Sequence, residues 1–194
     1  MALPPPSAWD SHTIRIPLDA AQRSLWQARL NSLAVLTQMG AELDISDDST
    51  VRIRLVRSLP AHAGGLGGDA INGATLAAMV DCAVASTGVL LFRGRTCGTL
   101  QLSIEYMKPV RTRLPELECR VLRRTNKLAF VEVRLFGPRR AIQLKASGIV
   151  SVANASMGDN ESWNSRFAAE AAPHAPTALS QLNPISSHDA AQPT

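Results

Sequence analysis

The segment 73–91 constrains the fold of this chain more than any other part of the sequence. It reads GATLAAMVDCAVASTGVLL, with no proline and one charged residue, Asp81, over a span long enough for a helix. A helix that is apolar on every side is buried on every side, so we expect a buried central helix. The helical neighbours of Asp81 cannot pair with its charge. A buried acid of this kind either bonds to another segment of the structure or belongs to a functional site.

Glycines precede this helix and let the backbone approach a ligand closely. They are Gly64, Gly65, Gly67, Gly68 and Gly73. Asn72 is a candidate N-cap, which leaves the amides of Gly73, Ala74 and Thr75 pointing out of the helix start. Free amides at the positive end of a helix suit an anion or a polarised carbonyl oxygen. Asp81 follows about 10–13 Å further along the axis. A substrate lying along the helix would place a carbonyl near the glycines and its neighbouring atoms near the acid, which is the outline of an acyl-transfer site.

Apolar and polar residues alternate on both sides of the helix and predict strands. The expected strands cover residues 51–56, 99–106, 117–121, 130–136 and 142–152. The links 124–127 and 137–140 are short enough for hairpins, so the sheet should be antiparallel. One face of that sheet must be covered, and 73–91 is the only wholly apolar segment available. We therefore predict an α+β fold in which about five or six antiparallel strands wrap around one long buried helix.

The two ends of the chain differ from this central part. Residues 17–40 show helical periodicity, with Asp19 as a cap, Gly40 as an end signal and Trp26 as an anchor on the core, which predicts an accessory helix. From about Asn154 the sequence is rich in Ala, Ser and Pro without periodicity, which predicts a disordered tail. The chain then divides into an N-terminal extension over 1–49, a domain over 50–153 and a tail over 154–194.

Composition argues against several classes of protein. Only 4% of the residues are aromatic, so platforms for stacking bases are scarce, and we expect no nucleic-acid partner. The three cysteines match no metal or redox spacing, and we expect no metal. Together with a start that lacks a signal pattern, they favour a cytoplasmic location. A membrane span is not expected, because an acid in mid-span is costly in lipid. The net charge of +4 suits either a phosphate-bearing ligand or an ordinary solvated surface.

The order of strand, glycine loop, apolar helix with an acid, and antiparallel meander resembles the hotdog-fold acyl-CoA thioesterases of the PaaI type. The similarity covers about residues 50–152. In that family a His-Gly-Gly turn opens the helix; here residues 72–74 read Asn-Gly-Ala, and the family's acid falls on Asp81. A Tyr-Met-x-Pro sequence that ends the next strand in many members is matched by residues 106–109. An upstream Asn that some members use is replaced by Leu66.

The resemblance implies a set of roles. Asp81 would be the general base or the nucleophile, the amides of Gly73 and Ala74 would bind the oxyanion with Asn72 as their cap, and Thr99 would assist from a neighbouring subunit. Coenzyme A belongs to the substrate, and no other cofactor is implied. The residues expected to contact the substrate are His62, Gly67, Gly68, Arg123, Arg124 and Lys127, the last three at the CoA phosphates.

The open edges of a sheet wrapped on one helix predict a homodimer or a homotetramer, with the active site between subunits. Two other functions stay open. The departures at Leu66 and Asn72 favour a protein that binds acyl-CoA without hydrolysing it. A hydratase of related fold would need an Asp and a His in the loop before the helix, and Asp69 with His62 imitates that pair poorly.

Overall fold

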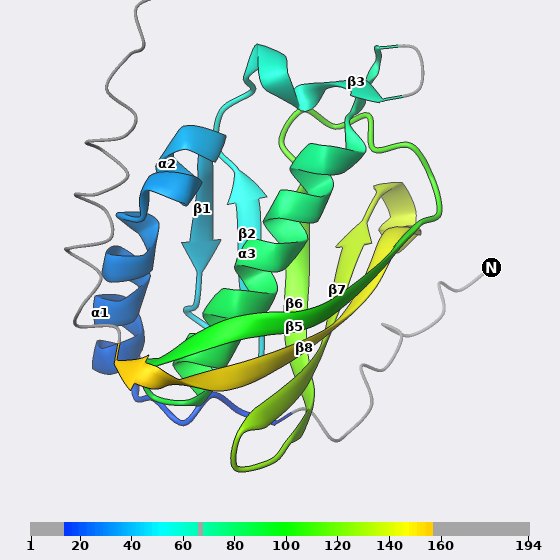
Figure 1. Ribbon diagram of the computed structural model, residues 1–194. Coiled ribbons are helices and arrows are strands. Elements are labelled where there is room, and N and C mark those ends of the chain that lie inside the picture. The colour runs from blue at the N-terminus through cyan, green and yellow to red at the C-terminus, as the bar shows by residue number, and fades with distance from the viewer. Residues whose placement is uncertain (1–13, 66–67, 157–194) are drawn as a thin grey trace, which may run out of the picture. The chain divides into compact units, whose positions relative to one another are not determined.

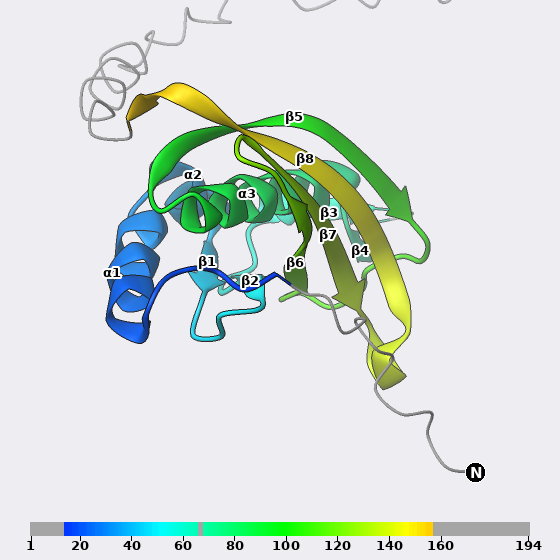
Figure 2. The same ribbon diagram turned by 90° about the horizontal axis from the view of Figure 1, so that it is seen from below.

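The computed structural model describes residues 14–65 and 68–156. In this part of the chain, a six-stranded antiparallel sheet curves around the helix α3 (Gly73–Leu91), as Figures 1 and 2 show. The strand order is β1-β2-β6-β7-β8-β5. The strands are β1 (Ala41–Asp44), β2 (Val51–Leu55), β5 (Arg95–Tyr106), β6 (Glu116–Arg124), β7 (Leu128–Phe136) and β8 (Ile142–Ser156). The predicted α+β architecture is confirmed.

The short connections place the remaining elements. A tight turn over 125–127 joins β6 to β7, and the 3-10 turn η2 (Pro138–Arg140) joins β7 to β8, so both predicted hairpins are present. Before α3, the 3-10 turn η1 (Pro60–His62) leads into a small separate pair of strands, β3 (Ala63–Gly65) and β4 (Ala70–Ile71). β4 ends just before the first residue of the central helix.

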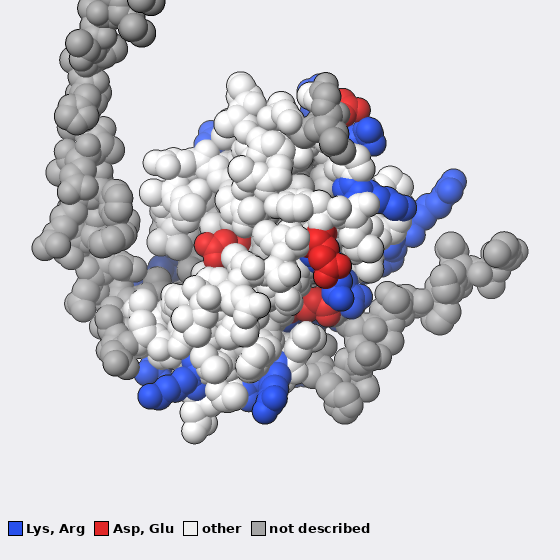
Figure 3. All heavy atoms as spheres, turned by 45° about the vertical axis from the view of Figure 1, so that its right-hand side comes forward, with Lys and Arg blue, Asp and Glu red and all other residues white. Residues whose placement is uncertain are grey.

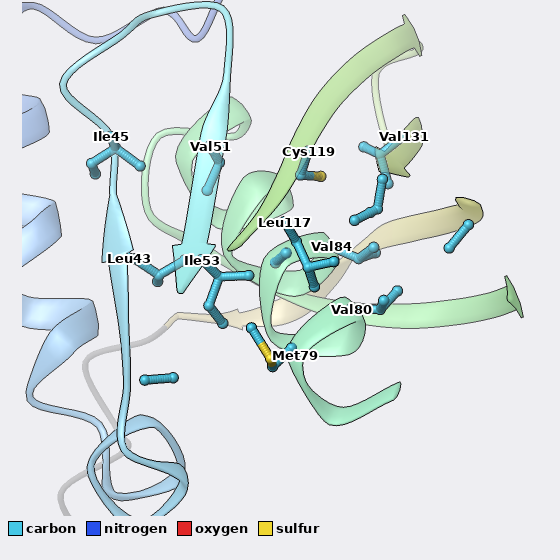
Figure 4. Packing of buried hydrophobic residues seen from close by; sticks show 14 of the residues in the cluster. Leu43, Ile45, Val51, Ile53, Met79, Val80, Val84, Leu117, Cys119 and Val131 are labelled. Atoms are coloured by element: carbon cyan, nitrogen blue, oxygen red, sulfur yellow. The ribbon is translucent and has the colours of Figure 1, made fainter. Parts of the chain in front are cut away.

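The core lies between α3 and the concave face of the sheet. Met79, Val80 and Val84 of α3 are fully buried; Met79 lies near Ile53 of β2 and Leu117 of β6 (Figure 4), and Val84 lies against Gly148 of β8. Strict alternation in the strands supplies these inward side chains, because successive strand residues point to opposite faces. A buried apolar core of this kind is the main stabilising contribution to the fold.

Two glycines let the helix and the sheet approach closely. Gly88 of α3 lies against Val150 of β8, and a Cβ at position 88 would overlap that side chain. Gly148 of β8 lies in the same way against Val84 of α3. The helix therefore packs closely on β8 at two glycines, because a larger side chain at either position would overlap its neighbour.

One side of α3 is open, and the prediction of a helix buried on every side is wrong. Ala74, Ala78 and Asp81 are exposed, and Ala77 and Ala85 are half-buried. These residues recur at steps of three and four and form one strip along the helix, here called the open strip. Alanines look apolar in a composition count, yet their small side chains bury little area and mark no inward face. Among the described residues α3 alone has the length and hydropathy of a membrane-spanning helix, and most of it is packed inside the protein.

The N-terminal region contains two helices rather than one over 17–40. These are α1 (Ala20–Asn31) and α2 (Ala34–Met39). Asp19 caps α1 by accepting a hydrogen bond from the amide of Gln22, as predicted. Gly40 ends α2 with a φ of +66°, a conformation that suits glycine.

Trp26 of α1 anchors the N-terminal helices on the core, as the sequence predicted. Its indole lies so close to Gly94, in the turn after α3, that a Cβ there would overlap the ring. Gly94 also has a φ of +85°, so glycine serves both the turn and this contact.

The sheet begins at Ala41, inside the segment 1–49 that was expected to precede the domain. The side chain of Asn31 in α1 donates to the Leu43 carbonyl (3.0 Å) and accepts from the Leu43 amide (2.7 Å). Gln27 of α1 accepts from the amide of Ile45 (2.9 Å). The outer edge of β1 is thus hydrogen-bonded by side chains of α1, whereas β5 at the other edge of the sheet pairs only with β8 in the described part of the chain.

At the C-terminal end of the described chain, β8 continues to Ser156. The rest of the tail that we predicted from residue 154 lies outside the described residues.

Candidate active site

A shallow groove runs between the open strip of α3 and the first half of β5. Asp81 borders it on the helix side, and Thr99 and Leu100 border it on the strand side. Apart from the polar Gln101, the rest of the lining is small or apolar and consists of Ala77, Ala78, Ala85, Cys97, Gly98 and Leu102. Because most of these side chains are small, a ligand or another chain can approach the helix closely here.

Asp81 is the one ionisable carboxylate of this groove. Its side chain is exposed and has no hydrogen bond or ion pair with any described residue. The expectation of a dry, buried carboxylate is therefore wrong for the single chain, because the open strip replaces the expected cover. The carboxylate instead faces a groove with its acceptor oxygens available.

Thr99 faces the same groove from β5. Its hydroxyl oxygen is buried and has no hydrogen-bond partner among the described residues. The resemblance assigned Thr99 to a neighbouring subunit; in this structure it borders the groove of Asp81 in its own chain. A buried hydroxyl without a partner is costly, so this group is set to bond a ligand or a water.

The start of α3 is held by Asn72, which is its N-cap as predicted. Its Oδ1 accepts from the amide of Thr75 (2.8 Å), and its Nδ2 donates to the carbonyls of Ala61 (2.6 Å) and Ala63 (3.1 Å). The amides of Gly73 and Ala74 are exposed and have no acceptor among the described residues. Two amides rather than the expected three are therefore free, since the cap uses that of Thr75.

A tyrosine that sequence reasoning treated only as a family motif contacts this helix start. The hydroxyl of Tyr106, the last residue of β5, donates to the carbonyl oxygen of Gly73 at 2.9 Å. Spacing could not have indicated this bond, because it joins a strand end to a helix start 33 residues away.

Beside these residues lies an apolar pocket of about 390 Å³. It opens next to the helix start and is lined mainly by Ile71, Gly73, Leu76, Tyr106, Met107, Pro109 and Val110. An apolar group attached to a carbonyl that sits on the Gly73 and Ala74 amides would reach this pocket directly.

The segment that carries these residues is similar to a known family. Residues 68–140, which include the helix start, Asp81, Thr99 and the β6–β7 hairpin, match the family model of the thioesterase superfamily. The segment is therefore similar to the thioesterase superfamily, and it lies within the helix-wrapping sheet described above, a hotdog fold, here called the hotdog domain. Among the curated proteins, none matches the sequence.

Several solved structures share the fold of the hotdog domain. The PaaI protein from the phenylacetic acid degradation operon of Escherichia coli is 13% identical, with a TM-score of 0.58 over 71% of this chain and 95% of that one. A putative thioesterase of Ralstonia eutropha, related to phenylacetic acid degradation, is 21% identical, with a TM-score of 0.56 over 66% and 98%. A thioesterase of Haemophilus influenzae is 14% identical, with a TM-score of 0.56 over 65% and 87%. At these identities the likeness establishes the fold.

His62 supports the hotdog domain's helix start from behind. Its side chain is only 3% exposed, and its Nδ1 accepts from the amide of Leu59 at 3.2 Å. Its carbonyl accepts from the amide of Asn72 at 2.8 Å. His62 thus shapes the loop and lines a pocket beside it rather than the Asp81 groove, and its contact with a substrate stays a prediction.

The loop residues near His62 form a second pocket rather than part of the groove. Gly68, with a φ of +91°, and Asp69 line this pocket together with Arg111. Asp69 bonds to Arg111 at 2.8 Å, and this hydrogen bond lowers the pKa of the Asp69 carboxyl. Because Asp69 pairs with Arg111 and not with His62, the arrangement that a hydratase would need is not formed. Gly67 and Leu66 lie outside the described residues.

The predicted phosphate-binding cations of the hotdog domain lie far from the free amides in the same chain. Arg123, Arg124 and Lys127 are exposed on the β6–β7 hairpin, and Arg124 stacks on Phe92 at the C-terminal end of α3. This helix is about 28 Å long, so the hairpin and the free amides lie at opposite ends of it. Figure 3 shows basic side chains gathered at the lower end of the molecule, the end at which Figure 1 draws this hairpin.

Neither a reactive cysteine nor a metal-binding cluster is found among the described residues of the hotdog domain. Burial raises the pKa of the Cys97 thiol, which borders the groove, to about 11, and burial together with the nearby Asp81 charge raises that of Cys82 to about 11. Both remain protonated near neutral pH and are weak nucleophiles. Within residues 14–65 and 68–156, no three His, Cys, Asp or Glu side chains gather as a metal ion would need.

Proposed function

We propose that this protein hydrolyses the thioester bond of an acyl-CoA to give a free acid and CoA. The observation that carries the proposal is the combination of an unpaired carboxylate, Asp81, with an unpaired hydroxyl, Thr99, in one groove on the helix whose first amides are free. The match of this segment to the thioesterase superfamily supports a thioester hydrolase.

The free amides of Gly73 and Ala74 would bind the thioester oxygen. When water or a carboxylate adds to the carbonyl carbon, the oxygen becomes an anion, and amide donors aimed at it stabilise the transition state. One such donor is typically worth about 3–4 kcal/mol. The positive end of the α3 dipole adds to the same effect. The adjacent apolar pocket would hold the acyl group.

Asp81 would act in one of two ways. As a general base it takes a proton from water while the water oxygen attacks the carbonyl carbon, and the CoA thiolate leaves. As a nucleophile it attacks that carbon itself, releases the thiolate and forms an anhydride, which water then cleaves to the acid and free Asp81. In both routes the Thr99 hydroxyl would orient the attacking water.

In a single chain, the free amides and Asp81 are too far apart to act on the same thioester carbonyl. The free amides and Asp81 are about 10–12 Å apart along α3, whereas reacting atoms must approach to about 3–3.5 Å. We infer that two subunits build each site. If two antiparallel α3 helices cross near Ala77, midway between Gly73 and Asp81, then each helix start faces Asp81 of the partner subunit. The small residues of the open strip allow such a close crossing.

The open edge of β5 supports this homodimer. β5 is twelve residues long, has no second neighbour in the described part of the chain, and exposes the side chain of Leu100. Antiparallel pairing of two β5 edges would satisfy the unpaired backbone groups and bring the two open strips together. Thr99 and Asp81 of one subunit would then act on a thioester held by the helix start of the other.

An assay with a panel of acyl-CoAs tests the proposal by measuring thiol release and the acid product. Wild-type protein should hydrolyse at least one member, and Asp81→Ala and Asp81→Asn should lower kcat by about 10²–10⁴-fold. Glu42→Gln is the matched control, because Glu42 is an exposed acid on β1, away from the groove. Equal turnover by the Asp81 variants and wild type would refute the role of the carboxylate.

A non-catalytic acyl-CoA-binding protein is the second candidate. Asn72 stands where the resembling family has His, and both polar atoms of its side chain are bonded to the chain itself, so it has little capacity left for a substrate. Tight binding of acyl-CoA by wild-type protein with no release of thiol would support this candidate and exclude the hydrolase.

A further inference from the structure

The hydrogen bond between Tyr106 and Gly73 joins the end of β5 to the first turn of α3. Tyr106 is the single tyrosine of the chain, and its hydroxyl donates to the Gly73 carbonyl oxygen at 2.9 Å. Within the first turn of a helix, the carbonyl of Gly73 also accepts from the amide four residues later. This carbonyl therefore has two donors, one from the helix and one from the strand.

The same peptide group carries one of the two free amides. The Gly73 carbonyl and the Ala74 N–H belong to one planar unit, in which the carbonyl points along the helix and the N–H points out of its start. A donor on the carbonyl oxygen polarises the unit and makes its N–H a better donor. The bond from Tyr106 also fixes the orientation of the plane, and so the direction in which the Ala74 N–H points.

We propose that Tyr106 is a positioning residue for the oxyanion site: its hydroxyl polarises and orients the Gly73–Ala74 peptide so that the Ala74 N–H stabilises the thioester oxyanion. This inference rests on the proposed function, because it assigns a role at the same site. Tyr106 acts through the backbone, and its hydroxyl is already engaged with the Gly73 carbonyl.

The end of β5 is held firmly enough for this role. Tyr106 pairs with Leu144 of β8, and the amides of the next two residues, Met107 and Lys108, both donate to the Gln143 carbonyl at 2.9 and 3.1 Å. The ring lies 3.6 Å from the position that a Cβ on Gly73 would take, which is ordinary contact. The hydroxyl is thus placed by the sheet and by packing on the helix start.

The first test is the kinetics of Tyr106→Phe, which removes the hydroxyl and keeps the ring. One oxyanion donor is worth about 10²–10³-fold in kcat, and polarisation changes a hydrogen bond by about 10–30%, so kcat should fall roughly twofold to eightfold. KM for the acyl-CoA should stay unchanged. Thr37→Val is the matched control: it removes an exposed hydroxyl that donates to a helix carbonyl, that of Leu33 at 2.8 Å, away from the site. Its kcat should equal that of the wild type.

The second test reads the carbonyl directly. In the Asp81→Asn background, a bound acyl-CoA with ¹³C at the thioester carbonyl should show a lowered C=O stretching frequency relative to the free molecule. Adding Tyr106→Phe should reverse part of that shift, because the Ala74 N–H then bonds the oxygen more weakly.

The outcomes separate this inference from the proposed function. If wild type releases thiol but Tyr106→Phe changes neither kcat nor the stretching frequency, the positioning role is wrong and the hydrolase stands. A rise in KM alone overturns it too, since the hydroxyl would then bind substrate. If wild type binds acyl-CoA without turnover, the hydrolase fails, and the frequency difference still decides whether Tyr106 tunes the amide. A ligand carbonyl that shows no shift at all in either protein refutes both the oxyanion role of the amides and the positioning role of Tyr106.

Discussion

The guanidinium of Arg124 lies over the ring of Phe92, 5.3 Å from its centroid, and this contact fixes the β6–β7 hairpin at the C-terminal end of α3. β5 runs in the opposite direction to α3, because Tyr106 at its end bonds to Gly73 at the helix start. If two β5 edges pair antiparallel, the hairpin of one subunit approaches the helix start of the other. Cations that are remote in one chain would then border the proposed site in a pair.

Removing these cations should weaken the binding of CoA. In the double variant Arg124→Ala/Lys127→Ala, we expect KM for acyl-CoA to rise about tenfold with little change in kcat, since charge-assisted bonds to phosphate contribute about 1.5–3 kcal/mol. The same acyl group on N-acetylcysteamine, which has no phosphate, is the control substrate. A similar loss with both substrates would show that the hairpin acts on something other than the phosphates.

The two-subunit site can be tested by complementation. Gly73→Pro deletes one free amide at the first helical position, where proline is tolerated, and the preceding Asn72 is already extended with a ψ of 153°. Gly73→Pro should lower kcat about 10²–10³-fold, and Asp81→Asn alone should also be nearly inactive. After unfolding and refolding the two variants together, one intact site per mixed dimer should restore about a quarter of wild-type activity. A mixture as inactive as its components would place both groups of each site in one chain.

A charge on the open sheet edge should prevent association. Leu100 is 66% exposed on β5, so Leu100→Asp should leave the fold intact and shift the protein toward monomers in sedimentation experiments, with activity lost in parallel. Leu25→Asp is the control, because Leu25 on α1 is similarly exposed, at 71%. Dimers that persist in Leu100→Asp would rule out the β5 edge as the interface.

Asn72 should matter for both stability and turnover. Asn72→Ala removes the cap of α3 and its bonds to the preceding loop, so we expect the free energy of unfolding to fall by about 1–2 kcal/mol and kcat to fall roughly tenfold as the free amides lose their alignment. Asp19→Ala removes the equivalent cap of α1, with a similar loss of stability measured in urea and unchanged kcat. If both variants kept full activity, the alignment of the helix start would be unimportant for the reaction.

The buried thiol of Cys119 predicts a loss of stability at high pH. Burial raises its pKa from 9.0 to about 12, although a hydrogen bond from Thr87 lowers it slightly. A raised pKa in the folded state means that the fold prefers the protonated thiol, so this contribution is complete below pH 9 and is lost as the pH rises toward 12. Between pH 8 and 10.5 the wild type should lose on the order of 1–2 kcal/mol more than Cys119→Ala, as measured by urea unfolding. If the free energy of unfolding changed with pH in the same way in both proteins, the buried Cys119 thiol would not be the cause of the loss of stability.

The sequence was sufficient to predict the wrapped sheet, the central helix, its cap at Asn72 and both hairpins. Each of these features follows from a local sequence pattern: alternating residues in the strands, a long apolar segment for the helix, and a capping residue before it. The chain's match to the thioesterase superfamily lies in the same region.

Other features depend on contacts that local pattern does not record. The open strip of α3 was missed because alanine occurs on buried and exposed faces alike. β1 was missed because its four residues, AELD, are too short for alternation to be recognised, and side chains of α1 complete it. The role of His62 in the loop and the bond from Tyr106 to Gly73 join residues that only the folded chain brings together.

The way α1 covers β1 has a consequence for how large an assembly can grow. The amide side chain of Asn31 occupies both backbone groups of Leu43, much as a neighbouring strand would, and Gln27 occupies the next amide. Within residues 14–65 and 68–156, strand-to-strand addition to the six-stranded sheet is therefore blocked at β1 and free at β5. Growth by this route stops once two copies have joined, so the fold carries its own protection against endless polymerisation into fibrils.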